Sequence, residues 1–357
     1  MAAGDAVSST ESVSEPAVAL AHRLLVRPAF QVAWGGRTRL VSTAVGARAR
    51  GASVLAVPAY RRPARVWRSI VAAKTALLPP ERSRASSAGD WLRDTLAHLE
   101  PDYAVIGTSG PFQSLLVRLR NPASECIEAI AKVMVSARSD AFARVRTEAE
   151  AMRDAEVQDI VPGIIAEGDV DGQPFLVMRF VSGRSLGACG KDLGRAHRAL
   201  RYQATSARKV PAMEHPWLEL VRAKLPCIGL DSLPNELGVV RTHGDFAPWN
   251  VVWASDDRPV VIDWEASVVD GVQHTDLAHY VLAVERFLRR RSPVVAAGTA
   301  VRVVTEMLAV DQREACAFVG LAAAAAILRD KPDKAVNGVD RYWREVIAAV
   351  LEHDSSR

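Results

Sequence analysis

Three polar residues stand at spacings that suit the transfer of a phosphoryl group. Asn250 follows Asp245 by five positions, and Asp263 follows Asn250 by thirteen. Apolar segments flank residues 245–250 and another apolar segment ends at Asp263, so we expect the three side chains at one end of a sheet, facing one cavity. Phosphoryl transfer needs a carboxylate that orients the acceptor hydroxyl and takes its proton, and oxygen ligands for the Mg²⁺ on the nucleotide phosphates. The spacing therefore predicts a site for this chemistry.

The same residues carry a resemblance to a known family. HGDFAPWN (243–250) and VVIDWE (260–265) resemble the aminoglycoside phosphotransferase and choline kinase-like family, whose signature HGDxxxxN precedes a strand ending in Asp-Trp-Glu. The resemblance covers about residues 104–330. It implies an α+β, bilobal, protein-kinase-like fold, with ATP as phosphate donor and a small-molecule hydroxyl as acceptor. By position it implies that Asp245 is the catalytic base and that Asn250 and Asp263 are the metal ligands, while His243 and Gly244 shape the loop.

A strand lysine and a helix glutamate upstream fit the same interpretation. Lys132 is the one cation in the apolar segment AIAKVMV (129–135), where a point charge can reach the α- and β-phosphates of a nucleotide. Either Glu148 or Glu150, on the helix expected at 142–155, could pair with it. The family pattern favours Glu148. A lysine whose stem lies along the sheet and whose charge reaches water remains the alternative for Lys132.

Two further segments are candidates for contact with the nucleotide. Between the first two strands of the expected nucleotide lobe, small residues suit a loop that covers phosphates with backbone N–H groups, although an ordinary hairpin turn fits equally well. These residues are Gly107, Thr108, Ser109 and Gly110. The segment FLVMRFVSGRSL (175–186) resembles the strand and hinge that join the lobes, where backbone groups of Arg179, Phe180 and Val181 would meet adenine.

Other polar residues near these motifs suggest structural roles. Asp276 aligns with a family aspartate, and we expect it to cap a helix. Glu265 fits either a position behind the metal ligands or an exposed strand end. The histidines in helical patterns are expected in the core or on the surface rather than in catalysis, and these are His197, His274 and His279.

Positive charge is concentrated in the first third of the chain. The formal net charge is +4, but residues 1–100 hold 14 basic and 7 acidic residues, or +7, while the remainder holds 31 and 34, or −3. A solvated basic surface is the favoured explanation of this uneven charge distribution. The functional alternative is attraction of a phosphorylated, nucleotide-linked or lipid-linked acceptor, or of an anionic surface. A nucleic-acid partner is disfavoured, because the aromatic residues of this segment form no stacking pattern.

The chain divides into four predicted regions. We expect a disordered tail at 1–15, a basic amino-terminal segment at 16–103, a nucleotide lobe at 104–182 and an acceptor lobe at 183–357. Within the basic segment, β-favouring runs at 24–26, 29–34, 37–45 and 53–57 alternate with turn signals, and a helix begins at Pro63. Helices are expected near 275–290, 294–308, 311–329 and 339–353.

Composition favours a soluble cytoplasmic protein. The four cysteines are dispersed, which disfavours a disulfide scaffold or a structural zinc site. No apolar run approaches the roughly 18 residues of a membrane span, and the start lacks the pattern of a secretory signal.

The acceptor is the least determined feature of the sequence. The segment AVERFLRRRS (283–292) is basic, whereas a pocket for cationic aminoglycosides needs carboxylates. A sugar, amino-sugar or related metabolite, with anionic and glycan-linked compounds included, is therefore favoured over an aminoglycoside-type antibiotic. Aromatic residues are too few to suggest a choline cage. A non-catalytic nucleotide-binding scaffold on the same fold is the competing class of protein.

Overall fold

The computed structural model describes residues 15–25, 30–34, 37–43, 47–56, 62–77, 96, 98–107, 113–136, 138–154, 157–226, 228, 230, 232–329 and 339–355. The chain forms two compact units. The first, here called the sheet unit, comprises Met1–Val145 and Ile164–Phe180, and the second, the helical unit, comprises Arg146–Gly163 and Val181–Arg357. Residues 1–14 of the expected disordered tail lie outside the described residues.

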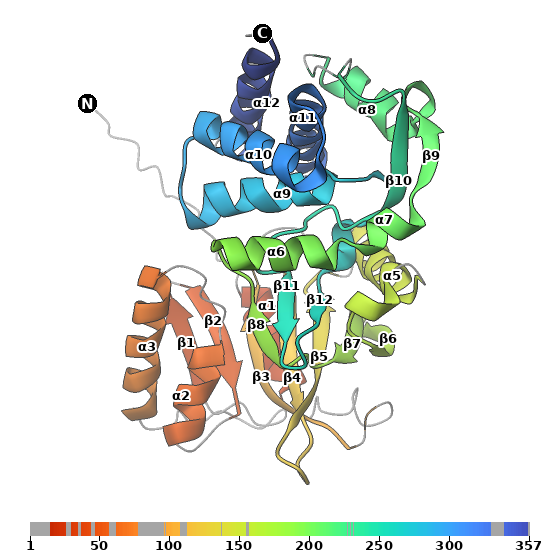
Figure 1. The fold of residues 1–357 in the computed structure, drawn as a ribbon. Helices are drawn as coiled ribbons and strands as arrows, with labels where there is room; N and C mark the ends of the chain where they lie inside the picture. The colour runs from red at the N-terminus through yellow and green to blue at the C-terminus, as the bar shows by residue number, and fades with distance from the viewer. Residues whose placement is uncertain are drawn as a thin grey trace, which may run out of the picture. The chain divides into compact units, whose positions relative to one another are not determined.

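A seven-stranded antiparallel sheet forms the centre of the sheet unit (Figure 1). In spatial order the strands are β1 (Phe30–Trp34), β2 (Arg37–Ser42), β3 (Glu100–Ile106), β4 (Ser114–Arg120), β5 (Ile127–Met134), β7 (Gln173–Arg179) and β6 (Ile164–Val170). Because β2 pairs with β3 and β3 with β4, the sheet continues across the boundary that we predicted between residues 103 and 104.

Side chains that alternate along each strand build a different core on each face of this sheet. Helix α1 (Glu15–Leu24) buries Leu20 and Leu24 against one face, where odd-numbered residues of β4 and β5, such as Val117 and Ala131, point. The opposite face of β1–β3 packs with α2 (Ala47–Ala56) and α3 (Arg62–Leu77). Lys132 is even-numbered and belongs to the face away from α1.

One strand expected in the basic segment is a helix. Residues 53–56 belong to α2, and the predicted strand at 53–57 is therefore wrong. Gly51 looked like a turn signal, but it lies where α2 and α3 approach. A Cβ placed on Gly51 would stand 3.5 Å from the carbonyl oxygen of Ala72, so the small residue permits close packing of the two helices. The predicted run at 24–26 is also wrong at Leu24, which ends α1.

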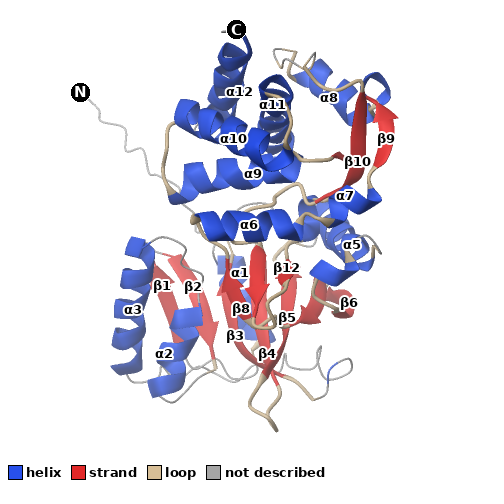
Figure 2. Cartoon of the chain, viewed as in Figure 1, coloured by secondary structure: helices blue, strands red, loops and turns tan. Residues whose placement is uncertain are grey.

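The helical unit combines two small sheets with a mostly helical part (Figure 2). The sheets have the orders β13 (Val268–Val272), β10 (Glu236–Thr242), β9 (Arg208–Pro211) and β12 (Pro259–Val261), β11 (Val251–Ala254), β8 (Gly183–Ser185). The helices are the end of α5 (Ser139–Arg153), α6 (Gly190–Ala199), α7 (Tyr202–Ser206), α8 (Pro216–Lys224), α9 (Thr275–Ala283), α10 (Pro293–Leu308), α11 (Gln312–Arg329) and α12 (Val339–Ser355), with a π-helical turn at Val284–Leu288.

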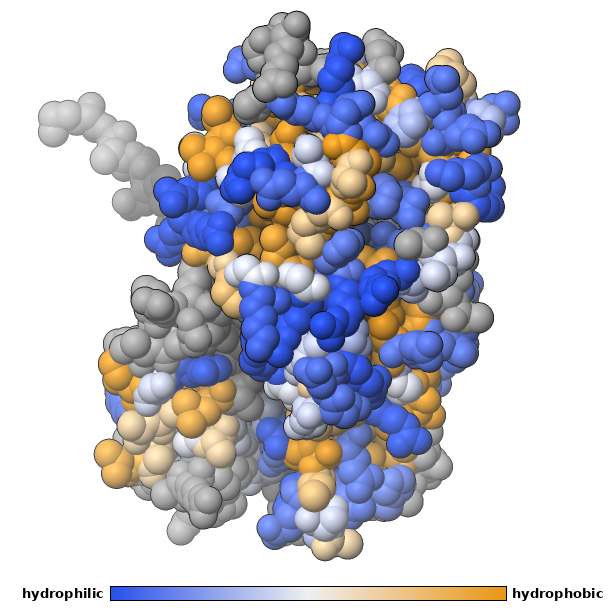
Figure 3. Space-filling model, in the orientation of Figure 1, coloured by the Kyte–Doolittle hydropathy of each residue, from blue (hydrophilic) through white to orange (hydrophobic). Residues whose placement is uncertain are grey.

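The core of the helical unit centres on α11. Its alanines other than Ala325, together with Phe318 and Leu321, are buried in the core that α11 shares with α9, α10 and α12. Small side chains allow these helices to pack closely. By contrast, α6 buries Ala196 and Ala199 on one side, and the surface over this helix is hydrophilic (Figure 3).

Taken alone, none of the described helices has both the length and the apolar composition of a membrane span. The pair α10 and α11 passes such a test only jointly, and the two are bent by 120°. The predicted α+β class, with an antiparallel-sheet part and a mostly helical part, is confirmed.

Candidate active site

A short hairpin places Asn250 and Asp263 at the same end of a sheet. Val251 of β11 pairs with Val261 of β12, so the residues just before β11 and just after β12 lie side by side. The Ile262 N–H donates to the carbonyl oxygen of Asn250 at 2.9 Å, which extends the ladder by one step. The expectation that Asn250 and Asp263 share one end of the sheet agrees with this register.

Gly244 allows the loop to turn directly after β10. Its φ is +75°, a left-handed conformation that side chains disfavour. A Cβ at this position would also lie 2.2 Å from the carbonyl oxygen of Ala266, which no packing adjustment of a side chain could relieve. This geometry is the physical basis for the interpretation of Gly244 as a residue that shapes the loop.

The carboxylate of Asp276 accepts hydrogen bonds from the backbone at the start of the loop. Its Oδ2 accepts hydrogen bonds from the His243 N–H at 2.7 Å and from the Gln203 side chain at 3.0 Å, and its Oδ1 accepts from the Gly244 N–H at 3.1 Å. Asp276 is 2% exposed, so these donors replace the water that the buried carboxylate has lost. We expected Asp276 to cap α9, but its carboxylate binds the loop instead.

His243 is a structural residue with a defined tautomer. Its Nδ1 accepts from the Asp245 N–H at 3.2 Å, so Nε2 must carry the proton that it donates to the carbonyl oxygen of Ile262 at 3.0 Å. The ring is buried and lies 4.8 Å from that of Trp264, centroid to centroid. The neutral ring thus ties the Asp245 loop to the segment that carries Asp263.

Asp245 accepts hydrogen bonds from an imidazole and a guanidinium on one of its oxygens. Oδ1 receives Nε2–H of His279 at 3.2 Å and a guanidinium N–H of Arg329 at 2.5 Å. Burial raises the pKa of Asp245, but the His279 hydrogen bond and the charge of Arg329 outweigh it and hold the pKa well below its usual range. Asp245 is therefore an ionised carboxylate at neutral pH.

The side chain of Asn250 is oriented by the same loop. Its Nδ2–H₂ donates to the carbonyl oxygen of Asp245 at 3.0 Å and approaches Oδ2 of Asp245 at 3.4 Å. Because the amide nitrogen faces Asp245, the amide oxygen points away from Asp245. This oxygen is the atom by which an asparagine ligates a hard cation.

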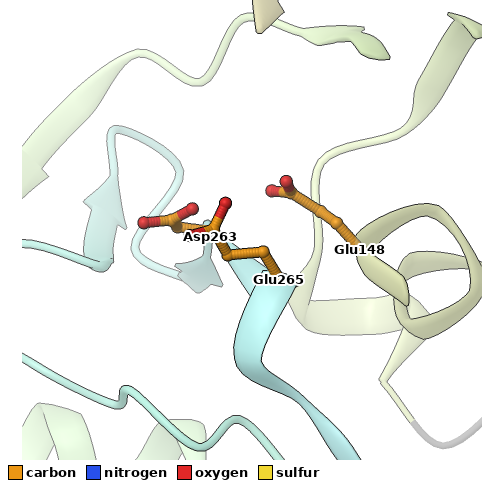
Figure 4. Close-up of side chains that lie close together, drawn as sticks. All are labelled: Glu148, Asp263 and Glu265. Atoms are coloured by element: carbon orange, nitrogen blue, oxygen red, sulfur yellow. The ribbon is translucent and has the colours of Figure 1, made fainter. Parts of the chain in front are cut away.

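Two further carboxylates lie close to the carboxylate of Asp263. Oxygen atoms of Glu148, Asp263 and Glu265 all lie within 4.8 Å of one another, and Figure 4 shows Glu148 turned toward the other two. Asp263 has a φ of +68°, a conformation that aspartate adopts more readily than most residues. Such a set of oxygen donors fits Mg²⁺, which prefers carboxylate and amide oxygens over nitrogen or sulfur. Glu265, left undecided from the sequence, belongs to this cluster.

An ion pair holds the end of α5 beside the strand that leads into the loop. Arg241, the residue before Thr242 in β10, donates through Nε to the Asp154 carboxylate at 2.7 Å. Arg241 is 8% exposed, which favours a close, directional pair over a loose one. On this helix Glu148 is 1% exposed, whereas Glu150 is exposed.

Lys132 occupies the middle of the sheet in the sheet unit. It stands opposite Leu116 of β4 and Leu176 of β7, and it is 5% exposed. A charged side chain this deeply buried requires an opposite charge or a polar ligand. The division between the units places Lys132 in one and Glu148 in the other.

The predicted nucleotide loop is only partly described. Gly107 directly follows β3. Its N–H donates to the carbonyl oxygen of Ser114, and a Cβ at Gly107 would lie 2.9 Å from that oxygen. Thr108, Ser109 and Gly110 lie outside the described residues.

The predicted hinge lies at the boundary between the units. Arg179 ends β7, Phe180 is 40% exposed with its N–H bonded to the Glu128 carbonyl oxygen, and the boundary falls between Phe180 and Val181.

His279 and Arg329 were not predicted as site residues. His279 lies three residues after Asp276 on α9, so both face the loop, and this spacing was the one signal that could have revealed it. Arg329 is 84 residues from Asp245, and no local pattern marks it.

Comparison with known proteins supports the resemblance in this region. Residues 201–300 match the model of the phosphotransferase enzyme family. This stretch contains Asp245, Asn250 and Asp263, so the resemblance to a phosphotransferase family that was stated from the sequence is confirmed over these residues. A search of curated protein sequences found no match.

Several solved structures are similar to the chain at low sequence identity. A thermostable mutant of aminoglycoside phosphotransferase APH(4)-Ia is 14% identical, over 75% of this chain and 99% of that one, with a TM-score of 0.45. The choline kinase LicA from Streptococcus pneumoniae is 13% identical, over 74% and 98%, with a TM-score of 0.42. The GDP and kanamycin complex of APH(2")-IIia is 16% identical, over 74% and 97%, with a TM-score of 0.39.

Proposed function

We propose that this protein transfers the γ-phosphoryl group of ATP to a hydroxyl of a small molecule. The observation that carries the proposal is the arrangement of the loop after β10. An ionised Asp245 lies in this loop, its carbonyl oxygen accepts a hydrogen bond from the Asn250 amide at the start of the β11–β12 hairpin, and Asp263 follows the other strand of that hairpin. The match of residues 201–300 to the phosphotransferase enzyme family supports the same reaction. A sugar, amino-sugar or related metabolite is the acceptor class that the sequence favours.

Asp245 acts on the acceptor hydroxyl in this proposal. Its Oδ1 already accepts from His279 and Arg329, whereas Oδ2 has one long contact of 3.4 Å with the Asn250 amide, so we assign the hydrogen bond of the incoming hydroxyl to Oδ2. Because the pKa of Asp245 is low, the carboxylate orients the hydroxyl first and takes the proton only as the new phosphorus–oxygen bond forms. This order suits the loose transition state of phosphoryl transfer, in which positioning matters more than early deprotonation.

The oxygen donors around Asp263 suit the metal that accompanies a nucleotide. Asn250 and Asp263 would hold Mg²⁺, with Glu265 close by. When bound, Mg²⁺ neutralises charge on the phosphates and orients them. We propose that Lys132, held by Glu148, binds the α- and β-phosphates, that Gly107 to Gly110 cover them, and that backbone groups of Arg179 to Val181 contact adenine.

The test is Mg²⁺-dependent phosphate transfer from ATP, with slow ATP hydrolysis as a readout that needs no acceptor. Asp245→Asn keeps the size of the side chain and removes the proton acceptor, so we expect a loss of about 10² to 10⁴-fold in rate. Asp256→Asn, at an exposed turn, is the matched control. GTP is compared with ATP in the same assay. Full activity of Asp245→Asn would remove Asp245 from the mechanism, and tight nucleotide binding without turnover on any acceptor would favour the scaffold alternative.

A further inference from the structure

A pocket of about 280 Å³ opens beside the catalytic loop within the helical unit. Thr242 and Gly244 at the start of the loop form part of its wall, and so do His279 and Arg329, the two residues bonded to Asp245. The rest of the wall comes from α8, β13, the start of α9 and the last turns of α11. Its volume is close to the lower end of the roughly 300–1,000 Å³ that small-molecule sites occupy.

Most of this wall is apolar. Trp217 and Leu220 contribute from α8, Val268 from β13, and Ala325 and Leu328 from α11. Leu220 is 45% exposed and Val268 is 40% exposed. Removing the apolar surface of such side chains from water would lower the free energy. Exposed apolar side chains that converge on one cavity indicate an apolar ligand more than a solvated channel.

The charges of the pocket oppose a cationic ligand. Among the described residues that line it, Asp276 is the acidic one, and its two oxygens already accept three hydrogen bonds from His243, Gly244 and Gln203. Arg329 adds a guanidinium to the wall. An ammonium group entering here would lose water, would find no carboxylate with an available oxygen among the residues that line the pocket, and would meet the like charge of Arg329.

We propose that this pocket binds the phosphate acceptor and that the acceptor is a hydroxyl compound with an apolar body and no positive charge. The inference rests on the proposed function, because it assumes that Asp245 receives the acceptor's hydroxyl. The apolar body lies against Trp217, Leu220 and Ala325, and the hydroxyl points to the loop. Its oxygen forms a bond to the γ-phosphorus of ATP, the bond from that phosphorus to the bridging oxygen breaks, ADP leaves, and the hydroxyl proton passes to Oδ2 of Asp245.

The experiment compares three hydroxyl compounds on the full chain, in the presence of Mg²⁺ and a non-hydrolysable ATP analogue. Phenyl β-glucoside offers an apolar body, glucose offers the same hydroxyls without it, and kanamycin offers hydroxyls with several positive charges. By calorimetry we expect phenyl β-glucoside to bind at least 10-fold more tightly than either of the others. Equal binding of phenyl β-glucoside and glucose, tighter binding of kanamycin, or no binding of any of the three would overturn the proposed acceptor class.

Two variants locate the binding in this pocket. Ala325→Phe fills the cavity and should weaken phenyl β-glucoside binding at least 10-fold, whereas Ala348→Phe, on the exposed face of α12, should not change it. Leu220→Gln, at a side chain that is already 45% exposed, should weaken it about 3-fold or more and is expected to fold normally. Thermal unfolding of each variant is measured as well, because a variant that only fills the pocket should unfold cooperatively, whereas a misfolded chain should not. Unchanged binding in both pocket variants would overturn the assignment.

Nucleotide binding by the wild-type chain, measured without any acceptor, keeps the two proposals apart. If nucleotide and Mg²⁺ bind but phenyl β-glucoside does not, the acceptor class is wrong and the proposed function stands. If no nucleotide binds, the proposed function itself fails.

Discussion

Arg329, the last residue of α11, donates a hydrogen bond of 2.5 Å to Oδ1 of Asp245 and another of 3.2 Å to the carbonyl oxygen of Gly244. The guanidinium therefore contacts both the carboxylate and the backbone of the same loop. His279 approaches Oδ1 from α9 at 3.2 Å. With two donors on one oxygen, the carboxylate is held in one orientation, and Oδ2, which has only the 3.4 Å contact with the Asn250 amide among the described residues, is the oxygen better placed to accept from a hydroxyl.

We predict that Arg329→Met will narrow the pH range of activity on the acid side. Burial raises the pKa of Asp245, and Arg329 is among the groups that hold it below its ordinary value near 4. Without the guanidinium the pKa rises, so the fraction of ionised Asp245 falls at a higher pH than in the wild type. The measurement is kcat/KM between pH 4 and pH 8, and we expect the acid limb to move to higher pH.

The control for this prediction is Arg302→Met. Arg302 pairs with Glu306 at 3.7 Å on the exposed side of α10, where screening by water makes an ion pair weak. This variant should retain the wild-type profile. If Arg329→Met also retained it, the guanidinium would have no influence on the titration of Asp245.

Gly244→Ala should destabilise the chain, and Gly194→Ala should not. At Gly244 the methyl group would meet the Ala266 carbonyl oxygen, and the φ of +75° disfavours any side chain. We expect a loss of about 1–3 kcal/mol in the free energy of unfolding. Gly194 lies inside α6 with nothing within 4 Å of its Cβ position, so alanine there should add about 0.5–1 kcal/mol. Urea unfolding of both variants measures the two changes, and equal shifts would contradict the argument.

Asp276→Asn should damage activity through the position of the loop. The amide can offer one oxygen, but the other Asp276 oxygen also accepts a backbone N–H, and an NH₂ group there would face a donor. We expect a loss of about 1–3 kcal/mol in stability and a lower kcat with little change in nucleotide affinity. Asp270→Asn breaks an exposed pair with Arg208 and serves as the control. Comparable losses in both variants would argue against a special role for Asp276.

Residues of this site that lie close together along the chain could be predicted from the sequence, whereas residues that tertiary packing brings together could not. Asn250 and Asp263 flank a hairpin whose register depends on a short turn, so their spacing alone placed them together. Glu148 was preferred to Glu150 from a pattern on one helix, and its burial agrees. Such relationships depend on local backbone geometry, which sequence periodicity reports directly.

Other parts depend on tertiary packing and left no local pattern. Asp276 looked like a helix cap because an acid near a helix start usually is one, but the backbone it binds is 32 and 33 residues away. The position of Arg329 depends on how α11 packs in the core of the helical unit. In the sheet unit, residues 53–56 of α2 were predicted as part of a strand, because Gly51, whose small size allows α3 to pack closely, resembled a turn residue.

Asp263→Asn should raise the Mg²⁺ concentration required for activity more than Glu265→Gln does. Both side chains lie in the cluster with Glu148, whose oxygens are within 4.8 Å of one another, but Asp263 continues directly from the hairpin end that carries Asn250. Losing a charged oxygen ligand should increase the Mg²⁺ requirement about 10- to 100-fold, and a carboxylate behind the ligands should matter less. The measurement is activity against Mg²⁺ concentration, together with direct Mn²⁺ binding, which reports on the site even in an inactive variant. If Glu265→Gln had the larger effect on Mn²⁺ affinity, the metal ligands would be Glu265 and Glu148 rather than Asn250 and Asp263.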